Sequence, residues 1–219
     1  MIKAVLLDMY GVIIKQTGDD FVPYIHRTHP ELTAEQIQSP WFRANAGEVT
    51  SLDIWRELGF TEDPEELEKE YLDTLELNDN VLDFLRSAQG KYKLALISND
   101  SSGWSRYVRE KFQLNQYFDA ISISGDIGIK KPDERIFRMT LEKLDVPASD
   151  CLYVDDRVKN LKATGLLGMH AVQLNSRGEE YAGTSFATFR ELTQALEEGR
   201  LETSEATDLR PKVTMPSFL

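Results

Sequence analysis

The sequence has little cysteine, no long apolar run and too few basic residues to balance its acids. Its 219 residues include one cysteine, Cys151, so the chain cannot form an internal disulfide. No apolar run is long enough to span a bilayer and no charged-then-apolar leader is present, so we expect a cytoplasmic protein. The formal net charge of −12 argues against nucleic acid or an anionic membrane as partner. A small anionic substrate stays open, because local charges decide its binding.

Short apolar runs alternate with helical patterns over most of the chain, which predicts an α/β fold. The composition is 41% hydrophobic, enough for one well-buried core and a smaller appended unit. The expected strands are residues 2–7, 93–97, 120–124, 151–154 and 171–174, and the expected helices are 80–87, 104–112, 134–144, 159–167 and 188–198. This alternation predicts a doubly wound parallel sheet with right-handed crossovers.

The segment between the first two strands has no strand pattern and is expected to be all-helical. Thr33 with Gln36 predicts a capping box, Ser51 precedes the amphipathic run LDIWREL, and Asp63-Pro64 opens a further helix. The last residues have the composition of a loose tail. We therefore expect an α/β core, a helical cap and a C-terminal tail, at residues 1–14 with 79–200, 15–78 and 201–219 respectively.

Polar residues follow the apolar runs, where open α/β sheets bind their ligands. Asp8 ends the first run, and Ser98 and Asn99 end the second, where a hydroxyl and backbone N–H groups can hold phosphate oxygens. Taken alone, Asp8 fits a turn cap equally well. The adjacent acids Asp155 and Asp156 repel each other, which favours a metal site over turn capping.

Two further segments carry candidate site residues. Lys131 is followed by Pro132, which fixes the loop, although a solvated lysine would fit the same pattern. In the helical segment, Phe42, Arg43 and Asn45 precede a glycine on a loop that could face the crevice. An inserted lid is where substrate choice is made, so these three are candidate substrate contacts.

The segments AVLLDMYGVI, ISND, SGDIGIKKPDERIF and YVDD, in this order and spacing, resemble the four motifs of the haloacid dehalogenase-like hydrolase superfamily. The resemblance is to the branch with a helical cap inserted after the first motif, and it leaves only the tail uncovered. It implies Asp8 as the attacking carboxylate, Ser98 as a phosphate ligand, Lys131 as the third-motif lysine, and Asp155 with Asp156 as the fourth-motif acids.

This family chemistry implies a magnesium ion. Attack of a carboxylate on phosphorus gives an aspartyl phosphate, which water then hydrolyses. Three carboxylates and a phosphate dianion would otherwise share one crevice with Lys131 as the balancing charge. Mg²⁺ takes oxygen ligands, so we expect Asp8, the backbone carbonyl of Tyr10 and Asp156 to bind it, with Asp155 as a further candidate.

Tyr10 departs from the phosphatase pattern. Most phosphatases of the superfamily carry an aspartate acid/base at this position, two residues after the nucleophile, whereas its dehalogenases often carry tyrosine. Two features argue against dehalogenation. Val12 occupies a position where those enzymes have threonine, and the aspartate pair occupies the fourth motif, which in those metal-free enzymes is rich in serine and asparagine. Some cap-bearing sugar phosphatases also lack the aspartate and share the GVI continuation.

We therefore expect a Mg²⁺-dependent hydrolase of small, sugar-like phosphomonoesters, with Asp8, Tyr10 and Lys131 as catalytic residues. The expected partner is a small phosphorylated metabolite, and the protein is expected to be a monomer or dimer. One alternative is a 2-haloacid dehalogenase, which needs no cation. The other is a protein of this fold that binds a ligand or partner with little turnover.

Overall fold

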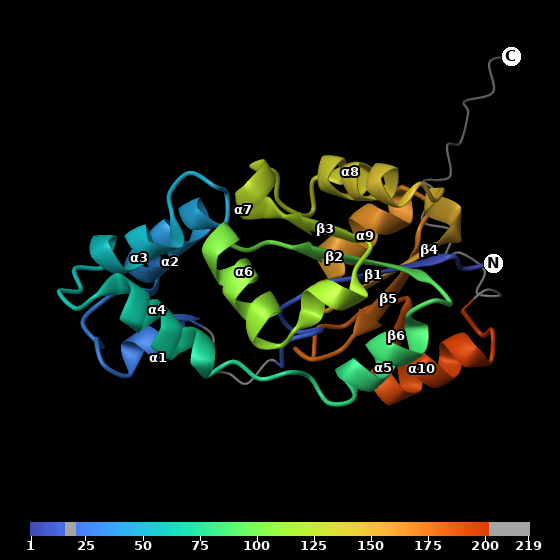
Figure 1. The fold of residues 1–219 in the computed structure, drawn as a ribbon, viewed down its shortest axis with the longest axis horizontal. Coiled ribbons are helices and arrows are strands. Elements are labelled where there is room, and N and C mark those ends of the chain that lie inside the picture. Colours follow the sequence, from blue (N-terminus) through green and yellow to red (C-terminus); the bar gives the residue numbers. More distant parts are fainter. Residues whose placement is uncertain (16–20, 202–219) are drawn as a thin grey trace, which may run out of the picture.

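The protein is built on a six-stranded parallel sheet, which the computed structural model shows together with its covering helices (Figure 1). The structure describes residues 1–15 and 21–201. The strand order is β3-β2-β1-β4-β5-β6. The bounds are β1 Ala4–Leu7, β2 Lys93–Ser98, β3 Ala120–Ile123, β4 Cys151–Asp155, β5 His170–Leu174 and β6 Thr184–Phe186. The doubly wound α/β fold predicted from the sequence is confirmed.

Strand β6 was not predicted, and the reason lies in its burial. Its three residues, TSF, are half-buried or exposed at one edge of the sheet, so they form no continuous apolar run. The five predicted strands are buried over most of their length, as strands covered on both faces are. Strand β3 ends earlier than predicted, because Ser124 begins a short helix.

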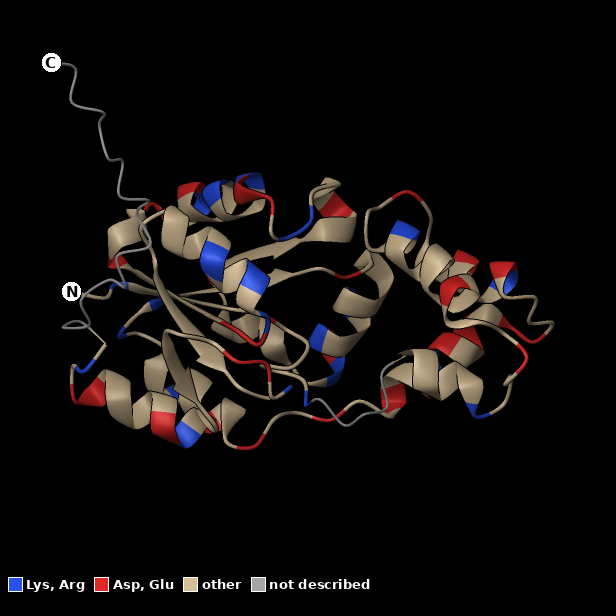
Figure 2. Cartoon of the chain, turned by 180° about the vertical axis from the view of Figure 1, so that it is seen from behind, with Lys and Arg blue, Asp and Glu red and all other residues tan. Residues whose placement is uncertain are grey.

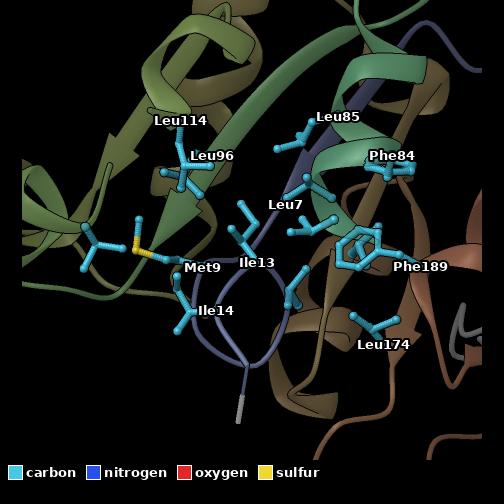
Figure 3. Close-up of a cluster of buried hydrophobic side chains, with 14 of the residues drawn as sticks. Leu7, Met9, Ile13, Ile14, Phe84, Leu85, Leu96, Leu114, Leu174 and Phe189 are labelled. Carbon is cyan, nitrogen blue, oxygen red and sulfur yellow. The ribbon is translucent and has the colours of Figure 1, made fainter. Parts of the chain in front are cut away.

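Alternate residues along the central strands enter two separate hydrophobic cores. Leu7 and Leu96 pack with Phe84 and Phe189 on one face, as Figure 3 shows, and Leu6 packs in a second cluster on the other face. The first face is covered by α5 Val81–Ala88, α6 Ser102–Lys111 and α10 Phe189–Glu197, and the second by α8 Glu134–Leu144 and α9 Val158–Leu166. Shorter elements are η1 Leu114–Tyr117, α7 Ser124–Ile127 and η2 Ala148–Asp150.

In the described part of the segment between β1 and α5, four helices gather beyond one end of the sheet (Figure 1). They are α1 Phe21–His26, α2 Ala34–Ala44, α3 Ser51–Glu57 and α4 Pro64–Asp73; we call them the insertion. Thr33 and Gln36 form the predicted capping box, and Asp63 caps α4. Helix α3 begins one residue earlier than expected, because Thr50 and Asp53 form a second capping box. Acidic residues recur along these helices (Figure 2).

The proposed division at residues 1–14 with 79–200, 15–78 and 201–219 remains a proposal. Most of the expected tail, residues 202–219, lies outside the described part of the chain. In the described part, no helix combines the length and the apolar composition needed to cross a bilayer.

The insertion packs closely against the core through aromatic rings and glycines. Phe21 contacts the rings of Trp55, Tyr71 and, on α6 of the core, Trp104, at centroid distances of 5.4, 5.1 and 5.0 Å. Gly47, with φ of +74°, lies so near the short helix α7 that an added Cβ would stand 2.5 Å from the carbonyl oxygen of Gly125. Side chains are therefore excluded where the two backbones meet.

Gly47→Ala should destabilise the protein more than Gly59→Ala. Both glycines have positive φ, at +74° and +84°, so both substitutions carry a similar backbone cost of about 1 kcal/mol. Gly59 has open space where its Cβ would lie, whereas Gly47 meets Gly125. We expect an additional loss of at least about 1 kcal/mol for Gly47→Ala, measured by urea unfolding. Equal losses for the two variants would contradict this packing of insertion on core.

Candidate active site

Two adjacent strands bring three carboxylates together. Asp8 follows β1 and donates its backbone N–H to the carbonyl oxygen of Val154 in β4, at 3.0 Å. Asp155 ends β4 and Asp156 follows it. The strand order reverses direction between β1 and β4, which is where α/β sheets open a crevice. One carboxylate oxygen from each of the three residues lies within 4.8 Å of the others.

Lys131 is buried at the centre of this group, with 3% of its surface exposed. Its ammonium lies 2.7 Å from Asp8 Oδ1 and 3.0 Å from Asp155 Oδ2. It also donates to the hydroxyl of Tyr153 and the carbonyl of Ile97, at 3.1 and 3.0 Å. Burial alone would lower its pKa, but Asp155 and Asp8 together raise it, so the lysine is charged.

Asn99 holds the backbone of Lys131. Its Nδ2 donates to the Lys131 carbonyl at 2.9 Å, and its Oδ1 accepts from the Lys131 N–H at 2.7 Å. Both ends of the amide are therefore used to place the lysine. The expected role of Asn99 in phosphate binding rests on its backbone, while the side chain is a positioning group.

Asp155 has a full set of donors. Its Oδ2 accepts from Lys131, from the Tyr153 hydroxyl and from Asn160 Nδ2, and its Oδ1 accepts from the backbone N–H of Arg157 at 2.7 Å. Burial raises its pKa, but the Lys131 charge and these hydrogen bonds together hold the pKa below its ordinary value. The side chain is thus an ionised partner of Lys131.

Asp156 has one carboxylate oxygen that is free to bind a ligand. Its Oδ2 accepts from Arg177 Nε, whereas its buried Oδ1 has no hydrogen-bond partner among the described residues. Burial, followed by the nearby charge of Asp155, raises its pKa. Gly11, with φ of +86°, permits this position, because an added Cβ would lie 2.4 Å from Asp156 Oδ2.

Asp8 is the carboxylate that faces the cavity. Its Oδ1 accepts from the Met9 N–H at 2.6 Å as well as from Lys131. Burial raises its pKa to about 8, with Lys131 acting in the opposite direction and Asp155 and Asp156 adding to the rise. A further cation beside Asp8 and Asp156 would favour the ionised form of both.

Tyr10 extends its phenol across the site to Asp100. The hydroxyl donates to Asp100 Oδ2 at 3.1 Å. Burial, and then the Asp100 charge, raise the pKa of Tyr10 well above its ordinary value, so the phenol stays protonated. Asp100 is also buried, and its Oδ1 accepts from the Ser101 N–H at 2.8 Å.

The residues predicted in the insertion separate into two groups. Phe42 and Asn45 line a cavity of about 320 Å³ that also contains Asp8, Tyr10 and Lys131. Arg43 is not among the lining residues. Its guanidinium pairs with Glu57 at 2.8 Å and with Glu48 at 3.7 Å on the insertion surface, because these carboxylates lie nearer than the crevice.

Ser98 lies at the carboxyl end of β2, as expected, and is fully buried. Its Oγ has no hydrogen-bond partner among the described residues, so the hydroxyl has a donor and acceptor available for a ligand oxygen. It is not a lining residue of the cavity, so its access to phosphate remains a proposal.

Sequence reasoning missed several groups at this site. Asp100 is the last residue of the quoted ISND segment, and Arg177 follows the end of β5, so the strand-end argument would have reached both. Tyr153 was missed because it lies within the apolar strand β4. The cavity is also lined by Trp41, Tyr71, Trp104, Lys130, Arg157 and Lys159.

Comparison with known proteins identifies the family. The family model described as haloacid dehalogenase-like hydrolase matches residues 2–166. The chain belongs to the haloacid dehalogenase-like hydrolases. The family resemblance stated from the four motifs is thereby confirmed, and the assignment to the cap-bearing branch stays a prediction.

Relatives of this haloacid dehalogenase-like chain include proteins named for different reactions. Drimenol cyclase drtB of Aspergillus calidoustus is 24% identical over 82% of this chain and 35% of its own length. (S)-2-haloacid dehalogenase 4A of Burkholderia cepacia is 27% identical over 53% of this chain and 49% of its own. Phosphoserine phosphatase of Thermus thermophilus is 35% identical over 36% and 32%, respectively. The chain thus covers half or less of each of these relatives.

A solved structure supports the same fold. A haloacid dehalogenase family enzyme from Bacteroides thetaiotaomicron, in complex with magnesium and inorganic phosphate, superposes with a TM-score of 0.70. The match covers 83% of this chain and 98% of that chain, at 20% identity. This likeness concerns the fold.

The donor set of this haloacid dehalogenase-like site fits a hard divalent cation. Asp8, Asp155 and Asp156 offer oxygen atoms only, as Mg²⁺ prefers. The unpartnered Oδ1 of Asp156 is a ready ligand, whereas the oxygens of Asp155 already accept four hydrogen bonds. Asp8 and Asp156 would therefore hold the metal, with the Tyr10 carbonyl as the further ligand expected from the sequence, and Asp155 is the partner of Lys131.

Asp155→Asn and Asp156→Asn should have different effects. Asp155→Asn removes a buried partner of Lys131 and should lower the free energy of unfolding by about 3 kcal/mol. Asp156→Asn should change stability by less than about 1 kcal/mol, since its partner Arg177 is partly exposed, but should weaken Mg²⁺ binding at least about tenfold. Urea unfolding and calorimetric Mg²⁺ titration measure the two effects. Loss of Mg²⁺ binding in a fully stable Asp155→Asn variant would reverse the assignment.

Proposed function

We propose that the protein is a Mg²⁺-dependent hydrolase of small phosphomonoesters that works through an aspartyl phosphate on Asp8. The observation that carries this proposal is the charge inside the cavity. The whole chain has a net charge of −12, yet five cations line this one cavity: Lys130, Lys131, Arg157, Lys159 and Arg177. Such a cluster favours an anionic group next to Asp8.

In the first step, the Asp8 carboxylate attacks phosphorus. Lys131 and the Met9 N–H both donate to Oδ1, so the attack falls to Oδ2. A bond forms between Asp8 and phosphorus, the bond between phosphorus and the alcohol oxygen breaks, and that oxygen takes a proton from the solvent. Lys131 shares the charge that spreads over the phosphoryl oxygens, and the Ser98 hydroxyl donates to one of them.

In the second step, water attacks the phosphorus of the aspartyl phosphate. The phosphorus–oxygen bond to Asp8 breaks, the carboxylate is restored, and inorganic phosphate leaves with the proton of the water. When bound, Mg²⁺ neutralises charge on the phosphoryl oxygens and aligns them with Asp8. The aromatic rings of the insertion restrict bulk water, which we take as its function as a cap.

Tyr10 stands where related phosphatases carry an acid/base aspartate. Its protonated phenol is a hydrogen-bond donor in the same cavity as Asp8, and Asp100 fixes its direction. A phenol that stays protonated is a poor base, so we expect hydrolysis of the aspartyl phosphate to be slow relative to its formation.

Asp8→Asn tests the proposal. The amide is nearly isosteric but cannot attack phosphorus, so kcat should fall by at least about 10³-fold while the fold is retained. Phosphate release from p-nitrophenyl phosphate and acetyl phosphate measures the rate, and mass spectrometry of acid-quenched enzyme should find phosphate on Asp8. The exposed Asp79 provides a matched control, since Asp79→Asn should retain full activity. Full activity in Asp8→Asn would exclude this mechanism.

A 2-haloacid dehalogenase is the second candidate, favoured by Tyr10 in the cavity and by the Burkholderia relative. Displacement of halide by Asp8 requires no cation, so metal dependence separates the two functions. We expect exhaustive chelation with EDTA to remove phosphate hydrolysis and Mg²⁺ to restore it. Chloride release from 2-chloropropionate that persists in EDTA, without phosphatase activity in Mg²⁺, would replace our proposal with the dehalogenase.

A further inference from the structure

The cavity is lined by groups of different chemistry from different elements. The cations and Asp8 come from the α/β core, whereas the insertion contributes Phe21, Trp41, Phe42, Tyr71 and Asn45. Four of these five insertion residues are aromatic, and Trp104 of α6 adds a further ring. At about 320 Å³, the cavity is at the lower end of the range for small-molecule sites.

Phe42 is exposed in a way that packing does not explain. Among the described residues, the large hydrophobic side chains classed as exposed are those of Met1, Phe42 and Leu166. Phe42 is 49% exposed, and its ring stacks on Trp41 with centroids 5.4 Å apart. Leu166 ends α9 and does not line the cavity, but Phe42 does. An apolar ligand group would cover the exposed part of the Phe42 ring and remove it from water.

The aromatic side of the cavity offers few partners for hydroxyl groups. The indole N–H of Trp104 already donates to Glu68, at 2.9 Å, and the phenol of Tyr10 donates to Asp100. Asn45 is 6% exposed, and its Oδ1 is buried without a partner among the described residues. A ligand with a single donor matches this acceptor, whereas a sugar has several hydroxyls that would lose water here without replacement.

We propose that the substrate is the phosphate monoester of a largely hydrocarbon alcohol, whose apolar part lies against Trp41, Phe42 and Trp104. This substrate class rests on the proposed phosphatase function and replaces the sugar-like leaving group expected from the sequence. The phosphate group contacts Lys131 and Asp8. The apolar group is bound by the hydrophobic effect, which is not directional, so the site accepts apolar groups of different shapes. Asn45 accepts a hydrogen bond from at most one polar group of the alcohol.

A series of ethyl, butyl and hexyl phosphates tests this substrate class, with glucose 6-phosphate as the polar comparison. Each methylene group that enters the aromatic region should raise kcat/KM about fourfold, and hexyl phosphate should exceed glucose 6-phosphate by at least about tenfold. Calorimetric titration with the corresponding alkyl phosphonates, which cannot be hydrolysed, should show affinity rising with chain length and a negative heat-capacity change.

Phe42→Gln and Leu166→Gln form a matched pair, because each replaces an exposed apolar side chain at the end of a helix. Phe42→Gln should reduce the hexyl-to-ethyl ratio of kcat/KM by at least about fivefold. Leu166→Gln should leave both the ratio and the rates unchanged. A ratio that is equal in the two variants would overturn the assignment of Phe42 to the binding of the apolar group.

The failures of the two proposals are distinguishable. Hydrolysis of p-nitrophenyl phosphate with no dependence on alkyl chain length, or with preference for glucose 6-phosphate, would overturn the substrate class and leave the phosphatase. Chain-length-dependent binding of the phosphonates without hydrolysis of any phosphate would support the apolar site and reject the phosphatase. Neither hydrolysis nor chain-length-dependent binding would reject both.

Discussion

The site depends on one buried ammonium group. Lys131 has almost no contact with water, and a cation in that position is stable only if carboxylates and dipoles replace its hydration. Asp155 supplies one charge, Asp8 the other, and the carbonyl of Ile97 a dipole. These partners come from the ends of three neighbouring strands, so the register of the sheet and the ionisation of Asp8 are linked. Asn99 completes the arrangement by fixing the lysine backbone.

The sequence predicted what depends on chain position, and it left undecided what depends on side-chain direction. Asp8 and the Asp155–Asp156 pair were recognisable because apolar strands end at these residues. Which acid of the pair accepts from Lys131 was not, since adjacent residues point apart and only the pairing of β1 with β4 selects Asp155. Arg43 was placed near the crevice on local grounds, but its partner Glu57 is on another helix.

The electrostatics of the cavity differ from those of the molecule. Acidic residues outnumber basic residues in the chain, and they recur along the helices of the insertion (Figure 2). Under physiological ionic strength, charges beyond about 8 Å are largely screened, so an anion inside the cavity responds mainly to the lysines and arginines that line it. The overall negative charge therefore does not prevent an anion from binding in the cavity. The aromatic rings add apolar surface to the same cavity, and the proposed substrate class rests on this combination.

The aromatic cluster around Phe21 contains the residues that give the protein its tryptophan fluorescence. The chain has three tryptophans, and all of them, Trp41, Trp55 and Trp104, have ring centroids within 6 Å of Phe21. Two belong to the insertion and one to the core helix against which it packs. Indole fluorescence therefore arises from this junction alone, and the distant parts of the sheet contribute no indole emission. A change in indole emission would therefore report a change at the junction of insertion and core.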